Sequence, residues 1–294
     1  MSPHRTLLAT SAAVLLLGGC GLVGGSAQTA APEAAEPAPG GTGQSASPDP
    51  DRDPAQVVLD ATEVTLGQTS LTIESQADLE VQGAASSVST EGSVDYEQGL
   101  FDLDRDVNDT TRVGVVADGT RAWIKNEGPD GSAFADGATW LQGDVDDLVS
   151  SGTFGQLQLL GSTLALRAAG DDPAAVAEGE PTTYDGVECR VLTLTVPYAD
   201  AVAAAGEDAA VFTEALSLTG PARRADLALE VAVGPDDVIR SYSLGVESAP
   251  GVSGGYEVLL TDIGEPVGPP LAPDPTDTAS GPEAIEQFAE LVGA

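Results

Sequence analysis

Residues 71–82 alternate apolar and polar side chains, and this period of two constrains the fold more than any other feature of the chain. The odd-numbered positions include Leu71, Ile73 and Leu79, whereas the even-numbered positions hold Thr, Glu, Gln or Asp. Successive side chains of a β-strand point to opposite faces, so the pattern predicts a strand with one buried and one solvated face. The sheet that contains this strand must then be covered on one side.

The same alternation returns in the four segments that follow, which predicts an antiparallel meander with short connections. Asp118-Gly119 separates the last two segments and is typical of a hairpin turn. The five predicted strands are residues 71–82, 87–96, 100–107, 112–117 and 120–126.

The second half of the chain mixes helical spacing with further strands. These are the predicted helical regions 144–169 and 199–218, and the predicted strands 184–196, 224–233, 238–246 and 256–263. Glycines divide the first helical region into two short helices. Runs of strands with helices between them indicate an α+β fold. We expect a strongly curved antiparallel β half-barrel with helices covering its concave face.

The N-terminus resembles the signal of a bacterial lipoprotein. An apolar run of 11 residues ends at Leu17 and is too short for a membrane span, which needs about 20 residues. Gly18, Gly19 and Cys20 follow, and the four residues resemble a lipobox, whose cysteine is modified with diacylglycerol and palmitate. We expect residues 1–19 to be a cleaved signal peptide and Cys20 to anchor the chain on the outer face of the cell membrane. The alternative is an ordinary signal with an incidental cysteine.

Composition divides the remaining chain into three parts. Residues 20–54 hold the lipidated cysteine and a tether rich in Gly, Pro, Ala and Ser, which cannot bury enough apolar surface to fold. The folded domain is predicted over residues 55–267. A Pro-rich C-terminal tail follows over residues 268–294, and it includes a short helical segment at 282–292.

Charge and composition exclude several functions. The chain has 11 Lys+Arg and 47 Asp+Glu, a formal net charge of −36, which argues against nucleic-acid binding. The only histidine, His4, lies in the signal peptide, so the mature chain has none for a Ser-His-Asp triad or a zinc site. Two cysteines are too few for a disulfide framework or a four-cysteine metal site. We expect no enzyme activity, no metal and no cofactor.

Two short motifs that suggest other chemistry have simpler explanations. Residues 251–255 have the form G-x-S-x-G, which in hydrolases holds a nucleophilic serine between a strand and a helix. Here strands are predicted on both sides and the mature chain has no histidine, so we expect a flexible hairpin loop. Residues 102–109 resemble half of a calcium loop, yet valines stand where an EF-hand needs Gly and Glu. We interpret them as the solvated face of a strand.

Cys189, within a predicted strand, is expected to be a small buried residue.

Taken together, these features resemble the LppX/LprA/LprF/LprG family of actinobacterial lipoproteins, which is distantly similar to LolA-type lipoprotein carriers. The resemblance covers residues 55–267. It lies in the order of lipobox, tether, meander, helices and closing hairpin, and in four segments: Asp118-Gly119-Thr120-Arg121-Ala122-Trp123, Tyr184-Asp185-Gly186-Val187, Asp237-Val238-Ile239-Arg240 and residues 256–267. It implies an apolar cavity between sheet and helices that holds acyl chains, and a role in carrying lipids or lipoglycans from the membrane outward.

The candidate lining of that cavity consists of apolar residues on the strand faces and helices. These are Leu71, Ile73, Leu79, Val81, Phe101, Leu103, Leu157, Leu160, Leu164, Phe212, Leu216, Leu227, Leu229, Leu244 and Val258. We predict a membrane-anchored lipoprotein that binds a lipid or glycolipid and carries or presents it in the cell envelope, with an envelope transporter or acceptor protein as partner. The alternative is a non-enzymatic structural or interaction module of the envelope, with the same fold and a filled core. A cavity of hundreds of Å³ would distinguish the two.

Overall fold

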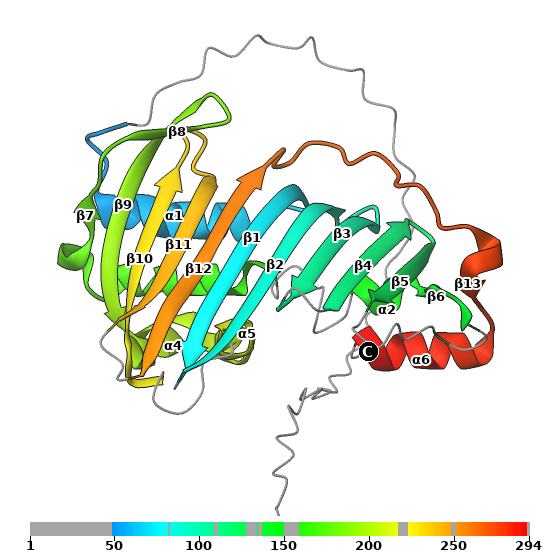
Figure 1. Cartoon of the computed structure of the whole chain (residues 1–294). Helices are drawn as coiled ribbons and strands as arrows, with labels where there is room; N and C mark the ends of the chain where they lie inside the picture. Colours follow the sequence, from blue (N-terminus) through cyan, green and yellow to red (C-terminus); the bar gives the residue numbers. More distant parts are fainter. Residues whose placement is uncertain are drawn as a thin grey trace, which may run out of the picture.

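The computed structural model describes residues 49–81, 83–108, 111–127, 134, 137–149, 159–216, 223–247 and 251–292. Within these residues, thirteen strands form one sheet, and helices lie on one of its faces (Figure 1). The predicted signal peptide, Cys20, most of the predicted tether and Leu157 are outside the described residues. None of the described helices has the length and apolar character needed to cross a membrane.

The first half of the sheet is the predicted meander, in which each strand pairs antiparallel with the next. Its strands are β1 Ser70–Val81, β2 Ala84–Asp95, β3 Leu100–Val107, β4 Thr111–Asp118 and β5 Arg121–Glu127. Gly119 adopts a φ of +85° in the predicted turn, a conformation that favours glycine. A further strand that was not predicted, β6 Trp140–Asp144, pairs with β5.

The second half of the sheet is a meander of four long strands with two short strands beside the first of them. They are β7 Ala177–Glu178, β8 Thr182–Tyr184, β9 Val187–Pro197, β10 Asp226–Val233, β11 Ile239–Glu247 and β12 Val252–Thr261. β12 pairs antiparallel with β1 from Thr72 to Val81, which joins the halves. The sheet is open, with the order β13-β6-β5-β4-β3-β2-β1-β12-β11-β10-β9-β7, where β13 is Thr278–Ala279, and β8 pairs with β9 beside this path.

The helices cover one face of this sheet in two groups. In the residues described, they are α1 Pro54–Leu66, α2 Val145–Val149, α4 Tyr198–Ala205, α5 Ala209–Leu216 and α6 Pro282–Val292, with 3₁₀ helices η2 Gly161–Gly170, η3 Pro173–Ala175, η4 Gly206–Asp208 and η6 Pro275–Asp277. In one group, α1, η2, α4 and α5 pack together, with α1 against β10 and β11 and α4 against β9. In the other group, α2 contacts β5 and β6, and α6 contacts β6 (Figure 1). The predicted α+β class, an open curved antiparallel sheet with helices over one face, is confirmed.

Helix α1 is an element that the sequence analysis did not predict. The side chain of Asp53 caps its N-terminus by accepting from the backbone N–H of Gln56 at 3.1 Å, and Pro54 occupies the first turn. Val57 and Val58 are buried on the side that faces the sheet. The first folded element therefore begins at the position where the tether was expected to end.

The C-terminal segment differs from the tail that was predicted over residues 268–294. β13 Thr278–Ala279 pairs parallel with β6 and forms one edge of the sheet. The predicted helix is present as α6, and its Phe288 and Ala284 are at most 5% exposed because they pack against the sheet. The sequence signal of α6 is its amphipathic spacing. The tail thus contributes a strand and a helix to the fold.

The G-x-S-x-G segment is also different from the expected hairpin loop. Ser253 and the two glycines after it belong to strand β12. Gly254 has a φ of +118°, and a Cβ atom there would lie 1.9 Å from the carbonyl oxygen of Asp78 on β1. The glycine is therefore required by close contact between two paired strands, and this accounts for the motif without catalysis.

Candidate functional site

The helix-facing side of the sheet carries one continuous apolar cluster. It includes side chains from β1, β3, β10, β11 and β12 and from the helical segments η2 and α5. Twelve of the fifteen residues predicted to line a cavity are in it and are at most 3% exposed: Leu71, Ile73, Phe101, Leu103, Leu160, Leu164, Phe212, Leu216, Leu227, Leu229, Leu244 and Val258. Leu79 is partly buried against the cluster. Val81 belongs to β1, and Leu157 is outside the described residues.

Polar contacts hold the larger helical group together. Arg167, at the end of η2, donates to Glu63 Oε1 of α1 at 2.8 Å and to Asp208 Oδ2 of η4 at 2.8 Å. It also donates to the carbonyl of Ala205 in α4 at 3.3 Å. One guanidinium therefore links three helical segments, so that this group can act as one cover over the sheet.

Polar contacts also join that cover to the sheet. The hydroxyl of Tyr242 on β11 donates to the carbonyl of Ser162 in η2 at 2.8 Å. The N–H of Ile239 donates to Thr65 Oγ1 of α1 at 2.9 Å. The backbone N–H of Tyr198 at the start of α4 donates to the carbonyl of Ala225, just before β10, at 3.0 Å. Apolar side chains of the cluster lie between cover and sheet as well, and apolar contact is non-directional.

The cover itself consists of short and irregular helices. η2 is a 3₁₀ helix of ten residues, and 3₁₀ runs beyond three or four residues are uncommon because their hydrogen-bond geometry is poor. α4 and α5 have eight residues each, below the length at which an isolated helix is stable in water. The cover therefore depends on packing against the sheet for its stability.

Sequence reasoning missed a charged residue on the apolar face. Arg105 on β3 has the same parity as Phe101 and Leu103, and its Nε donates to Thr90 Oγ1 of β2 at 3.2 Å. Thr90 is 5% exposed. The alternation of residues 100–107 contained this signal, because Arg105 is in an apolar register position. Asp102, Asp104 and Asp106, which alternate with these positions, lie on the other face, as predicted.

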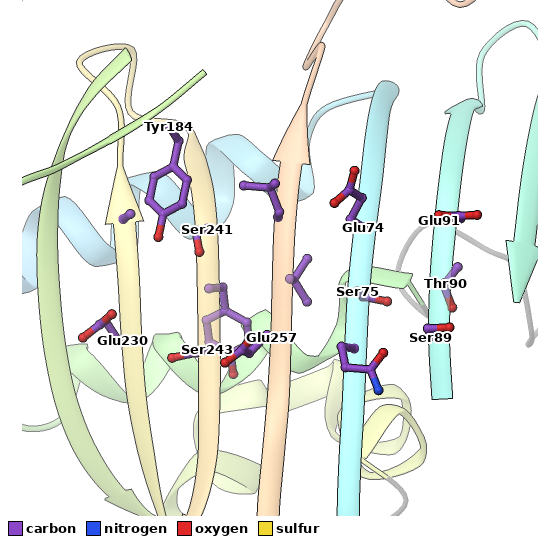
Figure 2. A pocket seen from close by; sticks show the side chains of 15 residues that line it. Glu74, Ser75, Ser89, Thr90, Glu91, Tyr184, Glu230, Ser241, Ser243 and Glu257 are labelled. Carbon is purple, nitrogen blue, oxygen red and sulfur yellow. The ribbon is translucent and has the colours of Figure 1, made fainter. Parts of the chain in front are cut away.

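The opposite, polar face of the sheet has a hollow of about 500 Å³ across β2, β1, β12, β11 and β10. Figure 2 shows carboxylates of Glu74, Glu91, Glu230 and Glu257 around it, with Tyr184 of β8 at the β10–β11 side. Small serine side chains of β11 and β2 leave the space open. The hollow is therefore polar and acidic, unlike the cavity predicted from the sequence, and none of its carboxylates was a predicted site residue.

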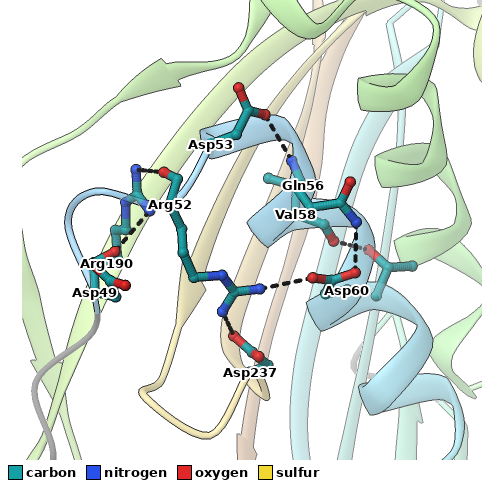
Figure 3. Close-up of polar contacts among 9 residues, drawn as sticks. Asp49, Arg52, Asp53, Gln56, Val58, Asp60, Arg190 and Asp237 are labelled. Carbon is teal, nitrogen blue, oxygen red and sulfur yellow. Dashed lines mark hydrogen bonds and ion pairs between the residues drawn. The ribbon is translucent and has the colours of Figure 1, made fainter.

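Residues 49–53, just before α1, contact β9 and the β10–β11 turn (Figure 3). Arg190 of β9 is 8% exposed, forms an ion pair with Glu178, and donates to the carbonyls of Asp49 at 3.2 Å and Arg52 at 3.0 Å. Arg52 in turn pairs with Asp60 of α1 at 2.7 Å and with Asp237. The last residues of the predicted tether are thus part of the folded structure.

Cys189 is fully buried, as the sequence predicts, but not in the main cluster. It packs with Val191 and Ala232 on the face of β9 that points away from the helices, next to Tyr184. Burial raises the pKa of its thiol, and a backbone hydrogen bond opposes this. Across the described residues, no group of three or more His, Cys, Asp or Glu side chains is placed to hold a metal ion.

The arrangement defines a class of fold: an open antiparallel sheet with a helical cover and an apolar layer between them. Solved structures similar to it include lipoprotein LppX of Mycobacterium tuberculosis, with 15% identity, coverage of 75% of this chain and 100% of that one, and a TM-score of 0.39. LprF of Mycobacterium bovis is similar with 11% identity, coverage of 77% and 99%, and a TM-score of 0.39.

A LolA-superfamily protein of Nitrosomonas europaea is similar with 8% identity, coverage of 74% of this chain and 96% of that one, and a TM-score of 0.22. At these identities the likeness concerns the fold alone. No protein-family model and no curated protein matches the chain.

Proposed function

We propose that this chain is a membrane-anchored envelope lipoprotein that binds a lipid or glycolipid between the sheet and its helical cover, and carries or presents it to an acceptor. The observation that supports this most is the continuous apolar cluster to which ten of the described strands and six helical segments contribute. The proposal involves no catalytic step. A transporter or acceptor protein in the envelope would deliver or receive the ligand.

The physical need for such a carrier comes from the ligand. Exposure of an acyl chain to water costs about 0.8 kcal/mol per methylene, so a chain of ~16 carbons costs on the order of 12 kcal/mol. Contact with leucine, valine and phenylalanine side chains removes most of this cost. The short helices of the cover would move away from the sheet to admit acyl chains, which would then replace contacts that the cover makes in the closed form.

The anchor is part of the same proposal. Cys20 would carry a diacylglyceryl group, and two acyl chains hold a protein on a membrane where one does not. The tether would let the folded part reach acceptors at a distance from the bilayer. A Cys20→Ala variant is expected to lose the membrane-bound fraction on cell fractionation, whereas retention in that fraction would contradict lipid anchoring at this residue.

The experiment that tests lipid binding uses the mature chain from residue 20 with Cys20→Ser, so that no attached acyl group contributes. The protein is purified without detergent, and its lipids are identified by solvent extraction and native mass spectrometry. Ala77 lies on the apolar face of β1, and its neighbour Asp78 is exposed on the polar face. We expect Ala77→Trp to lower bound lipid at least fivefold and Asp78→Trp to leave it unchanged, provided both variants show native circular dichroism.

A second function, an envelope interaction module with a filled core, has its own supporting observation. The predicted lining residues are in contact with one another, and the described hollow of about 500 Å³ is on the polar face instead. A lipid-free mass, with no uptake of offered lipids by either variant or the parent, would contradict the carrier proposal and favour this module. Uptake that depends on Asp78 and not on Ala77 would place the ligand on the polar face.

A further inference from the structure

Two hydroxyl groups in the helical cover are buried and have no hydrogen-bond partner. They belong to Ser162 of η2, which is 2% exposed, and to Tyr198 at the start of α4, which is 5% exposed. A buried hydroxyl without a partner destabilises the folded state, because it has lost its hydrogen bonds to water and gained none in return. Most buried polar side-chain atoms in proteins do have a partner, so these two exceptions call for an explanation.

Buried threonine hydroxyls of the same cover are hydrogen-bonded within their own helices. Thr62 of α1 donates to the carbonyl of Val58 at 2.7 Å, and Thr163 of η2 donates to the carbonyl of Leu160 at 2.7 Å. Ser162 directly precedes Thr163 in the same 3₁₀ helix, and its hydroxyl makes no bond of this kind. Burial in a helix of the cover therefore does not by itself leave a hydroxyl unpartnered.

Both residues belong to the layer between cover and sheet. The carbonyl of Ser162 accepts from the hydroxyl of Tyr242 on β11 at 2.8 Å, so Ser162 is in direct contact with the sheet. The ring of Tyr198 is part of the apolar cluster and stacks on Phe212 of α5, with ring centroids 5.9 Å apart and an angle of 27° between the planes. The two unpartnered hydroxyls are thus in the layer where the acyl chains of the proposed ligand would lie.

Helix α5 adjoins both positions. Phe212 makes the stack with Tyr198, and Ala215, three residues further along α5, lies against Gly161. A Cβ atom at Gly161 would be 3.0 Å from Cβ of Ala215, and Gly161 is the residue before Ser162. A lipid that lies along α5 would therefore contact both residues that carry the hydroxyls.

The surroundings of the two hydroxyls suit a neutral oxygen and not an ion. The cluster beside them consists of apolar side chains, and Arg167, the cation of η2, is already held by Glu63 and Asp208. An ion placed in such a layer would lose its hydration and meet no free opposite charge. A hydroxyl can donate to a neutral carbonyl oxygen, and lipids carry such oxygens where an ester joins each acyl chain to the rest of the molecule.

We propose that the hydroxyls of Ser162 and Tyr198 donate hydrogen bonds to the carbonyl oxygens of acyl esters, so that the ester groups of the lipid lie under the cover together with the acyl chains. This inference rests on the proposed function and narrows the ligand to acyl-ester lipids, as opposed to ether-linked lipids. Bound lipid would supply the hydrogen bonds that the two hydroxyls lack, and this gain favours the loaded form over the empty one.

The test is a competition between two neutral lipids that differ only in their ester carbonyls. The mature chain with Cys20→Ser is offered an equimolar mixture of dioleoylglycerol and the corresponding dioleyl diether of glycerol, and native mass spectrometry measures the ratio of the two lipids bound. Ser162→Ala and Tyr198→Phe each remove one unpartnered hydroxyl. Thr163→Val is the matched control, because it removes a buried hydroxyl of the same helix that already has its partner.

We expect the parent protein and Thr163→Val to bind the ester over the ether by about tenfold or more, as two hydrogen bonds allow. Ser162→Ala and Tyr198→Phe should each lower that ratio about fivefold, the effect of one hydrogen bond, and the double variant should lower it further. Binding of the ether should stay the same in all variants. An unchanged ratio in both single variants, with lipids still bound, overturns this inference and leaves the proposed function standing.

Urea unfolding of the lipid-free proteins gives a second, independent readout. Ser162→Ala and Tyr198→Phe should not lower the unfolding midpoint, because neither hydroxyl has a hydrogen bond to lose, whereas Thr163→Val should lower it. A midpoint lowered by both Ser162→Ala and Tyr198→Phe would show that these hydroxyls have partners in the lipid-free fold, which also overturns the inference. Failure of the parent to bind either lipid overturns the proposed function itself.

Discussion

The ring of Phe288 in α6 lies directly on the backbone of Gly143 in β6. A Cβ atom at residue 143 would be 2.1 Å from Cγ of that ring, so any side chain there would displace the phenylalanine. Phe288 is fully buried by this contact. The C-terminal helix therefore has a defined position on the sheet, although the segment that leads to it is rich in proline.

The first prediction follows from this contact. Gly143→Ala should lower the free energy of unfolding by about 1–3 kcal/mol, because the added methyl group forces Phe288 out of its position. Urea denaturation measures the change. Gly268→Ala is the matched control, since no atom lies within 4 Å of its added Cβ. Its effect should stay within about 0.5 kcal/mol, and equal effects of the two variants would contradict the role assigned to Gly143.

Arg190 carries the second prediction. Its replacement in Arg190→Gln leaves the half-exposed Glu178 and the carbonyls of Asp49 and Arg52 without their guanidinium donor. We expect a loss of about 1–3 kcal/mol in unfolding free energy, reduced by the solvent exposure of Glu178. Hydrogen exchange of residues 49–53 should become faster.

The control for Arg190 is an exposed arginine. Arg121 pairs with Asp118 at 2.9 Å while its side chain is 53% exposed, so Arg121→Gln should change stability little. If exchange of residues 49–53 were the same in Arg190→Gln as in the parent, the docking of this segment would depend on other contacts.

The third prediction concerns the reactivity of Cys189. In a mature chain with Cys20→Ser it is the sole thiol. Burial raises its pKa, and the thiolate is the reactive form. Ellman's reagent at pH 8 should react at least a hundredfold more slowly with the native protein than with protein in 6 M guanidinium chloride. Comparable rates in the two conditions would show that the side chains packed around Cys189, those of Val191, Ala232 and Tyr184, give the reagent ready access to the thiol.

The fourth prediction is a pH dependence at Tyr242. Burial raises the pKa of this phenol well above 10, so the folded protein keeps the proton that the unfolded chain releases near pH 10. The stabilisation from its hydrogen bond to Ser162 is therefore complete below pH 10 and declines as pH rises further. Tyr242→Phe should be less stable than the parent by about 1–2 kcal/mol at pH 7.

The difference between the two proteins should shrink above pH 10 by up to about 1.4 kcal/mol per pH unit, because phenylalanine has no proton to lose. Paired urea titrations at pH 7, 9 and 10.5 measure it, and the other tyrosines cancel in the comparison. A difference that is constant over this range would mean that Tyr242 ionises equally well in the folded state.

The strands were predictable where one face of the sheet is buried and the other is solvated. Residues 71–82 show this most clearly, because a shift of one residue would expose Leu71 and Ile73 and bury the glutamates. β6 and β13 were missed because they are short, and their pairing at the sheet edge depends on contacts distant in sequence. α1 was missed although Asp53 and Pro54 are typical of a helix start.

The site was predictable only in its apolar part. The position of a residue on the helix-facing side follows from parity, and twelve predicted residues are together in one cluster for that reason. Whether helices close onto those residues or leave a space depends on how η2 and α5 pack, and periodicity carries no information on this. Arg105 was overlooked because an arginine is expected on the solvated face, and its parity was the better guide.

The contacts of Arg190 and Arg52 also have a mechanical consequence. A chain held at its N-terminus transmits any pull to the folded part through residues 49–53, and there the two guanidinium groups divide the load between β9, the β10–β11 turn and α1. Arg167 passes part of this load from α1 to α4, whereas α6 packs on β6 near the other edge of the sheet. Tension on the tether would therefore enter at one edge of the sheet, and α6 lies near the opposite edge.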